Sequence, residues 1–277
     1  MNPWDGKDAV DAVELMDIGF DKMREHLRPT YRAHRAITVG GIQPNIIPEL
    51  GQIWWFVRDA NMPAAKETFD KLTKIGEGAA LMTGTTMDYQ IDAAAWPQLS
   101  LKSIADVLQS NINAVGMPQW SDEEQRFARQ FQSAMGAKSV GLNMSVTPLG
   151  AQPQVAASDD KGDVSWVVPS AALYFPASVP GINYHNWPAA VTPSSTIAHK
   201  GMVAGSKALA GAILDYLTKP ELVRQARAEF DQATAEMKYF DVLPADAKPP
   251  LDLNKGTMDR YRAEMSKFYL NKPVRFN

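Results

Sequence analysis

The side chains of this sequence that are best suited to chemistry are its four histidines, because it contains no cysteine. An imidazole can move a proton or ligate a metal near neutral pH. His199 follows the polar run SSTIA at the start of a predicted helix, where it can reach a site at the end of a sheet. His34 opens a predicted strand, His185 lies in a proline-rich loop, and His26 lies at the polar end of the first predicted helix. For each histidine, an ordinary packed or surface position is the competing interpretation.

An amide and a guanidinium group indicate a carboxylate site. Asn45 stands between two prolines in the run GGIQPNIIPE, a rigid loop of turn residues that presents one amide. Arg58 ends the apolar run IWWFV, and a guanidinium at a strand end can hold a carboxylate through two hydrogen bonds. From spacing alone, an ordinary strand-end charge is the simpler interpretation of Arg58.

Other common reaction centres are missing from the sequence. It contains no P-loop, no GxGxxG after a strand, and no HExxH, GxSxG or CxxC motif. The acidic run DDKGD at residues 159–163 lacks the ligand count of a calcium loop, which favours a solvated turn. Zero cysteines exclude disulfides, thiolate nucleophiles and cysteine-ligated zinc.

Composition narrows the choice of partners. The 277 residues hold 28 Lys and Arg against 31 Asp and Glu, so there is no basic surplus and we expect no nucleic-acid partner. The hydrophobic share of 45% is enough for a folded core. No run approaches the roughly 20 apolar residues of a membrane helix, so we expect no membrane partner either.

The elements that position these residues fall into two groups. The first ninety or so residues read as helix, strand, strand, helix, strand. The expected ranges are a helix over 8–23, strands over 34–39 and 53–57, a helix from Asn61 until Gly76 and Gly78 loosen it, and a strand over 85–91.

The remaining residues are mainly helical in pattern. Their expected ranges are helices over 100–116, 121–136 and 197–217, loops over 136–162 and 176–195, and a strand over 163–168 that is buried on both faces. Ser121 and Glu124 form a predicted capping box, and Thr218 with Glu221 is predicted to cap a further helix. One more short helix is expected in the tail.

Four runs of this sequence resemble a known family in the right order. They are HRAITVGGIQPNIIPELGQIWWFVRDA, IGEGAALMTGTTMDYQI, GDVSWVVP and SSTIAHKGMVAGSKALAGAILDYLTKPELVRQARAEF. Together they resemble the C-terminal portion of the zinc-dependent aminoacylase and carboxypeptidase family of amidohydrolases. The branch that they resemble is the aminobenzoyl-glutamate utilisation protein B type.

The resemblance implies an α/β protein with two parts. Residues 1–92 would be an α+β lid domain that makes the dimer, and residues 93–277 would be the C-terminal half of a metallopeptidase-like catalytic domain. The start MNPWDGKDAV resembles the family segment just after the first lid strand. We therefore expect a lid without its first strand, and a sheet with a gap or an exposed edge.

The resemblance also implies a role for each candidate residue. His34 matches the lid histidine that polarises the scissile carbonyl of the partner subunit's substrate. Asn45 and Arg58 match residues that bind the carboxylate end of the substrate, and His185 matches a loop histidine on the substrate side. His199 matches the last metal ligand of the catalytic domain.

The implied activity is cleavage of the amide bond of an N-acyl amino acid, for example one like aminobenzoyl-glutamate, by a homodimer with zinc or manganese. One histidine cannot hold a hydrolytic metal pair, so we expect the isolated chain to lack a complete metal site and to be inactive. The alternative is a non-catalytic dimerisation or carboxylate-binding protein that keeps this scaffold.

Overall fold

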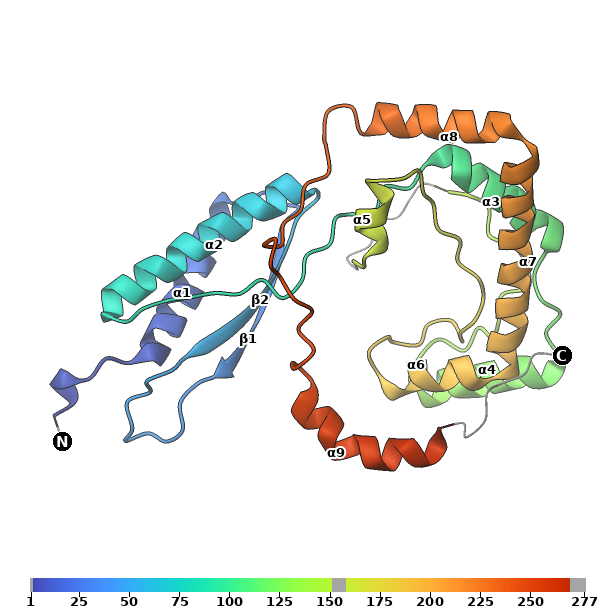
Figure 1. Ribbon diagram of the computed structural model, residues 1–277. Helices are drawn as coiled ribbons and strands as arrows, with labels where there is room; N and C mark the ends of the chain where they lie inside the picture. The colour runs from blue at the N-terminus through green and yellow to red at the C-terminus, as the bar shows by residue number, and fades with distance from the viewer. Residues whose placement is uncertain (1, 151–157, 270–277) are drawn as a thin grey trace. The chain divides into compact units, whose positions relative to one another are not determined.

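The computed structural model describes residues 2–150 and 158–269 (Figure 1). These residues form two compact units: unit 1 comes from Met1–Ala94 and Phe240–Asn277, and unit 2 from Ala95–Tyr239. Helices dominate both units, and the sheet of the described residues has two strands. This mixture agrees with the predicted α/β class at a coarse level.

The sheet of unit 1 is an antiparallel hairpin of β1 (Arg32–Val39) and β2 (Gln52–Arg58). His34 lies opposite Phe56 in the register. On the inner face, the Trp55 ring packs 4.9 Å from the ring of Phe20. On the outer face, Trp54 and Phe56 remain about half exposed with their rings 5.5 Å apart. The hairpin therefore has one covered face and one open face.

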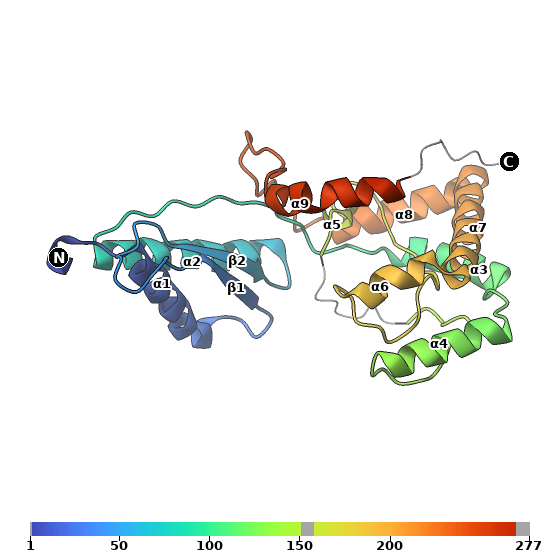
Figure 2. The same ribbon diagram turned by 90° about the horizontal axis from the view of Figure 1, so that it is seen from below.

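Two helices cover the inner face of this hairpin. They are α1 (Ala9–Met23) and α2 (Met62–Thr83), and Figures 1 and 2 show them beside the two strands. The Asp8 carboxylate caps α1, and the Asn61 side chain accepts from the amide of Ala64 to cap α2, so the helix begins where the sequence predicts it. The rest of unit 1 holds 3₁₀ turns at Pro3–Asp5, Arg24–His26 and Ser266–Phe268, and the tail helix α9 (Lys255–Met265).

Helix α2 is longer than predicted, because Gly76 and Gly78 do not loosen it. Gly76 is buried, and a Cβ there would lie 3.2 Å from Met16 of α1 and nearer still to Met87, so the glycine permits close packing. The helix ends at Gly84, whose φ of 66° is the left-handed conformation that glycine adopts without strain.

The predicted strand over 85–91 is wrong. This segment is extended but pairs with no strand among the described residues. Met87 packs against Gly76, and the Tyr89 ring lies 5.6 Å from Phe69, so the segment runs back along α2. Its side chains alternate as in a strand, but a strand also needs a neighbour for its backbone hydrogen bonds.

The regular secondary structure in the described part of unit 2 is all helical. Its helices are α3 (Lys102–Val115), α4 (Asp122–Ala134), α5 (Lys161–Ser165), α6 (Trp187–Val191), α7 (Thr196–Thr218) and α8 (Pro220–Ala233), with a 3₁₀ turn at Thr192–Ser194. A core cluster of Ala128, Leu142, Val179 and Ile197 joins α4, two loops and the start of α7. No helix in the described residues is long and apolar enough to span a membrane.

The predicted strand over 163–168 is also wrong, because its first residues lie in α5 and the rest form a turn. Ser165 is fully buried, and its hydroxyl accepts from the amide of Leu99 at 2.9 Å. Val164 and Val167, by contrast, remain more than half exposed. A strand buried on both faces requires neighbouring strands, and the described part of unit 2 contains none.

Of the two predicted helix caps in unit 2, one is confirmed. Ser121 and Glu124 form the reciprocal capping box of α4. At α8, the cap position is Lys219 without a side-chain hydrogen bond, while the Thr218 hydroxyl donates to the Leu214 carbonyl inside α7. Thr218 therefore closes the preceding helix and does not cap the next one.

Candidate functional site

The first turn of α7 presents His199. The Ser195 side chain accepts from the amide of Ala198 and so caps the helix. Ile197 and Ala198 are buried and anchor this turn, whereas His199 is exposed. The imidazole is therefore held on a fixed backbone and faces away from the core of unit 2.

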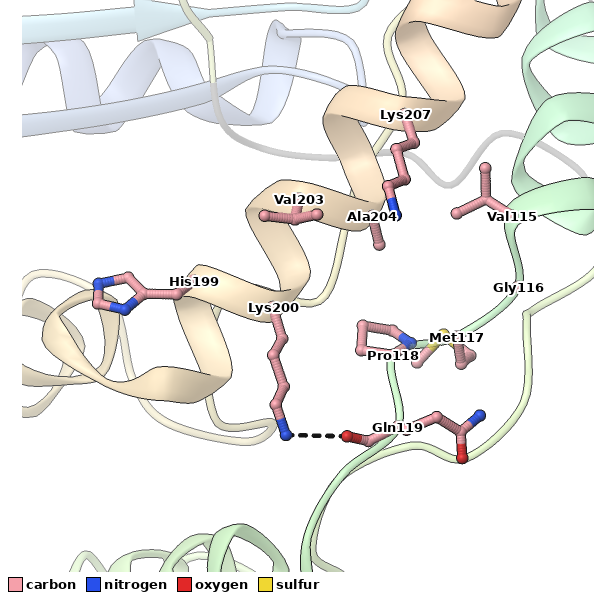
Figure 3. A pocket seen from close by; sticks show the side chains of 10 residues that line it. All are labelled: Val115, Gly116, Met117, Pro118, Gln119, His199, Lys200, Val203, Ala204 and Lys207. Carbon is pink, nitrogen blue, oxygen red and sulfur yellow. Dashed lines mark hydrogen bonds between the residues drawn. The ribbon is translucent and has the colours of Figure 1, made fainter. Parts of the chain in front are cut away.

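A pocket of about 440 Å³ lies between the first half of α7 and the loop that follows α3. Its lining residues are Val115, Gly116, Met117, Pro118, Gln119, His199, Lys200, Val203, Ala204 and Lys207 (Figure 3). The Lys200 ammonium donates to the Gln119 carbonyl at 2.9 Å and so ties the loop to α7. In Figure 3 the His199 ring and the Lys200 side chain leave the helix in different directions.

The pocket combines positive charge with apolar walls. Lys200 forms an ion pair with Glu124 at 2.7 Å. Lys207 lines the pocket too and forms no ion pair with another described residue. Met117 and Val203 supply apolar surface. Such a lining suits a ligand that carries both an anionic and an apolar group.

Glu124 explains why Lys200 does not add a free positive charge. Burial by itself would raise the pKa of the Glu124 carboxyl, but hydrogen bonds from the Lys200 ammonium, the Ser121 amide and the Thr196 hydroxyl outweigh it and lower the pKa to about 2. Glu124 is therefore ionised at neutral pH and neutralises Lys200. Lys207 remains as the cation that a bound anion can use.

The described residues do not fit a resident metal by themselves. All four histidines lie within ranges 2–150 and 158–269, yet these ranges contain no group of three or more His, Asp or Glu side chains that could hold a metal ion. A zinc site normally requires at least three protein ligands. His199 can supply one of them.

The other candidate residues of unit 1 lie on or near the open face of the hairpin. In the register His34 lies opposite Phe56, and Arg32 lies opposite Arg58. His34 and Arg58 therefore share the outer face, and only one residue pair, which points to the inner face, separates them along the hairpin. The Arg58 guanidinium lies 5.6 Å from the centre of the Phe56 ring, a cation–π contact that orients it. An imidazole and an oriented guanidinium on one surface can bind the two ends of a small acyl amino acid.

Asn45 lies in the exposed loop between β1 and β2. The amide group of Gln43 donates to its side-chain oxygen at 2.7 Å, so the amino group of Asn45 is the part that can donate to a ligand. Asn45, His34 and Arg58 all belong to unit 1.

His185 is exposed in a loop of unit 2, the unit that also holds His199. Its φ of 61° is unusual for a residue other than glycine. The next residue, Asn186, accepts from the amide of Trp187 and caps α6. His185 therefore occupies a strained position that is fixed by the helix that follows.

The pocket is the part of the site that sequence reasoning missed. A signal for its helical wall existed, because Lys200, Val203 and Lys207 follow one another at helical spacing and share a face. The opposite wall at 115–119 is distant in sequence, and no periodicity in the chain indicates that contact.

No protein-family model matches the chain. Individual proteins do match. The chain is 30% identical over 275 residues to one subunit of the p-aminobenzoyl-glutamate hydrolase of Escherichia coli, a match that covers 90% of this chain and 57% of that protein. The chain is homologous to members of the aminoacylase and peptidase family of amidohydrolases.

Two mammalian members of this family are similar as well. The Xaa-Arg dipeptidase of Mus musculus is 29% identical over 82% of this chain, and that of Homo sapiens is 27% identical over 87%. These matches cover 47% and 49% of the two dipeptidases. The chain thus spans about half the length of the curated relatives that it matches.

Proposed function

We propose that this chain is part of a metal-dependent amidohydrolase that cleaves the amide bond of an N-acyl amino acid, with p-aminobenzoyl-glutamate as the model substrate. The observation that carries this proposal is the 30% identity with the E. coli hydrolase over 90% of the chain. The pocket beside His199 supports it, because a cationic lining with apolar walls suits an aromatic acyl group and a carboxylate.

Within this proposal, residues 1–92 form a lid that makes a homodimer, and residues 93–277 form the C-terminal part of the catalytic domain. Two helices on one face of an antiparallel hairpin support the lid assignment. The sheet of this lid would gain a strand between β2 and residues 85–91. Among the described residues, the free edge of β2 and the segment 85–91 each lack a strand with which to pair. Such a strand would satisfy backbone groups on both sides.

The proposed roles in unit 1 follow from the open face of the hairpin. His34 would donate a ring N–H to the carbonyl oxygen of a substrate held by the partner protomer, as negative charge develops on that oxygen. Arg58 would hold the substrate carboxylate through two hydrogen bonds, and the amino group of Asn45 would add a third. The exposure of His34 and Asn45 supports these roles.

The proposed roles in unit 2 concern the two remaining histidines. His199 would be one ligand of a zinc or manganese ion whose other ligands lie outside the described residues, since those residues contain no group of three. His185 would contact the substrate from its strained loop. The chain without the remaining ligands would be inactive.

A turnover assay tests this proposal. The purified chain is incubated with p-aminobenzoyl-glutamate and with an Xaa-Arg dipeptide, in the presence of zinc or manganese, and released products are separated by chromatography. We expect no turnover by the chain alone. Turnover should begin when the part of the E. coli relative outside the matched stretch is supplied, and the variants His199→Ala and His34→Ala should abolish it. Robust turnover by the chain alone would contradict the expected inactivity.

A second candidate function is a non-catalytic protein that binds carboxylates or forms dimers on the same scaffold. The lack of a metal-ligand group in the described residues favours it. Under this candidate, the chain binds p-aminobenzoyl-glutamate without metal, Arg58→Ala weakens binding, and Arg32→Ala, its neighbour across the hairpin, serves as the matched control. Catalysis by the completed protein would rule this candidate out.

A further inference from the structure

The outer face of the hairpin carries three residue pairs in a row, and each pair has a different chemistry. The pairs are Arg32 with Arg58, His34 with Phe56, and Ala36 with Trp54. Residues directly opposite each other in an antiparallel pair have Cβ atoms about 5 Å apart, and the next pair on the same face follows at about 7 Å along the strand. The face therefore presents a cationic end, then an imidazole beside a phenyl ring, and then an indole beside a methyl group.

Trp54 and Phe56 form the aromatic part of this face. Their ring centres lie 5.5 Å apart at an interplanar angle of 76°, an edge-to-face contact that fixes each ring against the other. The two residues are still 45% and 49% exposed. Ala36, opposite Trp54, is exposed as well, and its small side chain leaves room beside the indole.

The sequence of β2 departs from the usual alternation at these two positions. A strand with one solvated face normally places polar residues on that face, because apolar side chains gain nothing from contact with water. Positions 54 and 56 instead hold a tryptophan and a phenylalanine, directly before Arg58 on the same face. Adjacent exposed aromatic groups beside a cation favour a ligand that is itself aromatic and anionic.

We propose that Trp54 and Ala36 form the subsite for an aromatic acyl group, and that they make the proposed hydrolysis specific for amino acids whose nitrogen carries such a group. In these molecules a carboxylate, an amide carbonyl and an aromatic ring follow one another in that order. Arg58 would bind the carboxylate, His34 the carbonyl oxygen, and Trp54 one face of the ring. The three groups of the ligand thus meet the three residue pairs in the same order.

Phe56 would act as a positioning residue in this arrangement. The Arg58 guanidinium lies 5.6 Å from the centre of the Phe56 ring, which in turn contacts the Trp54 ring. The phenyl ring therefore sets the spacing between the group that binds the carboxylate and the group that binds the acyl ring. The roles of Arg58 and His34 belong to the proposed function, on which this inference rests.

Ligand-observed NMR on the full chain tests the inference. The two probes are p-aminobenzoyl-glutamate and N-acetyl-glutamate, which share the glutamate and the amide and differ in the acyl group. We expect the wild type to bind the aromatic probe about tenfold more tightly, with saturation transfer strongest at its ring protons, because stacked rings gain more than the buried area alone provides. Trp54→Ala should remove most of this preference without changing the affinity for the acetyl probe, and Trp54→Phe should retain a preference.

A variant of the opposite strand tests the same subsite without removing an aromatic ring. Ala36→Val fills the room beside the indole and should weaken binding of the aromatic probe alone, while a β-branched residue remains compatible with the strand. The matched control is Trp4→Ala, which removes a tryptophan that is 76% exposed and lies outside the hairpin. This control should change neither affinity. Circular dichroism should show the same helix content in all these variants.

Four results would overturn the inference: no binding of the aromatic probe, equal affinity of the wild type for both probes, an unchanged preference in Trp54→Ala, or an equal loss in Trp4→Ala. Binding of both probes that depends on Arg58 but shows no acyl preference would contradict the inference and leave the proposed function standing. Binding is measured without turnover. A completed protein that shows the preference but hydrolyses neither probe would therefore support the inference and contradict the proposed hydrolase.

Discussion

Among single residues, Glu124 links three parts of unit 2. Its side chain is 9% exposed and accepts from the Ser121 amide at 2.7 Å, the Lys200 ammonium at 2.7 Å and the Thr196 hydroxyl at 2.8 Å. These bonds join the start of α4 to the start of α7, next to the pocket. The ionised carboxylate is therefore a structural support for the turn that presents His199.

The variant Glu124→Gln should lower the free energy of unfolding by about 1 to 3 kcal/mol at pH 7, because it leaves Lys200 with a weaker partner. The pKa of Glu124 falls from 4.5 to about 2 on folding, so its contribution is present above pH 4.5 and is lost as the pH falls toward 2. Urea unfolding at pH 7 and near pH 2 measures both values. The wild type and the variant should differ less at the lower pH, and the exposed neighbour variant Glu123→Gln should show little effect.

The Glu124 network also shows what sequence can predict about one residue. Its capping box with Ser121 was predicted, because the two positions are three residues apart and their bonds depend on local backbone alone. Its bonds to Thr196 and Lys200 join residues that are 72 and 76 positions apart, and no local pattern encodes them. The same limit explains why the pocket was missed.

At the scale of elements, a glycine inside α2 and the glycine that ends this helix should respond in opposite ways to substitution by alanine. Gly84 ends the helix at φ 66°, where a Cβ is strained, so Gly84→Ala should destabilise the protein by about 1 kcal/mol. Gly78 lies inside the helix, and a methyl group added there would meet no atom within 4 Å, so Gly78→Ala should stabilise it by up to about 1 kcal/mol. Thermal unfolding followed by circular dichroism measures both, and equal signs would contradict this interpretation.

The start of α3 depends on a side chain from α8. Its cap position, Leu101, has no side-chain acceptor, and the Glu229 carboxylate instead accepts from the amides of Lys102 and Ser103 at 2.8 and 2.9 Å. Burial alone would raise the pKa of Glu229, but the hydrogen bonds from Ser103 and the Lys102 amide outweigh it and lower the pKa. An acidic group at a helix start is also favoured by the helix dipole.

We therefore expect Glu229→Ala to cost about 1 to 2 kcal/mol of unfolding free energy, as the loss of a helix cap usually does. Amides in the first turn of α3 should exchange faster with solvent in this variant, as measured by hydrogen exchange. The control is Glu236→Ala, an exposed glutamate just after α8. Equal protection of α3 in the wild type and in Glu229→Ala would contradict the capping role.

The helices were largely predictable from sequence, whereas two of the four predicted strands were wrong. Helices satisfy their backbone hydrogen bonds within one segment, so periodicity and caps nearly suffice to place them. A strand needs a neighbour, and the alternation in 85–91 and the apolar run in 163–168 cannot provide one. The hairpin of β1 and β2 was predictable because each strand provides the hydrogen-bonding partner that the other needs.

At the scale of the whole molecule, the purified chain should retain far less than one zinc ion after dialysis. The reason is that its described residues offer no group of three ligands, and His199 alone binds weakly. Elemental analysis of the dialysed protein measures the zinc content, and His199→Ala should leave it unchanged. One tightly held zinc per chain would contradict this prediction, because it would require a group of ligands that is absent from the described residues.

The family was predictable from sequence because its motifs follow one another along the chain in order. How the candidate residues cooperate was not predictable in the same way. His34 and Arg58 share a face of one hairpin, while His185 and His199 belong to the other unit. Cooperation between such groups depends on tertiary and quaternary contacts, which no motif encodes.

The hairpin of unit 1 has a practical consequence for anyone who purifies this chain. Strand β2 has no proline and no charge between Gln52 and Arg58, and its outer edge has no neighbour among the described residues. Bare, aromatic-rich edges of this kind tend to recruit copies of themselves into aggregates. Yield and solubility should therefore improve with any polypeptide that pairs along β2, and light scattering during concentration offers a simple assay for such a polypeptide.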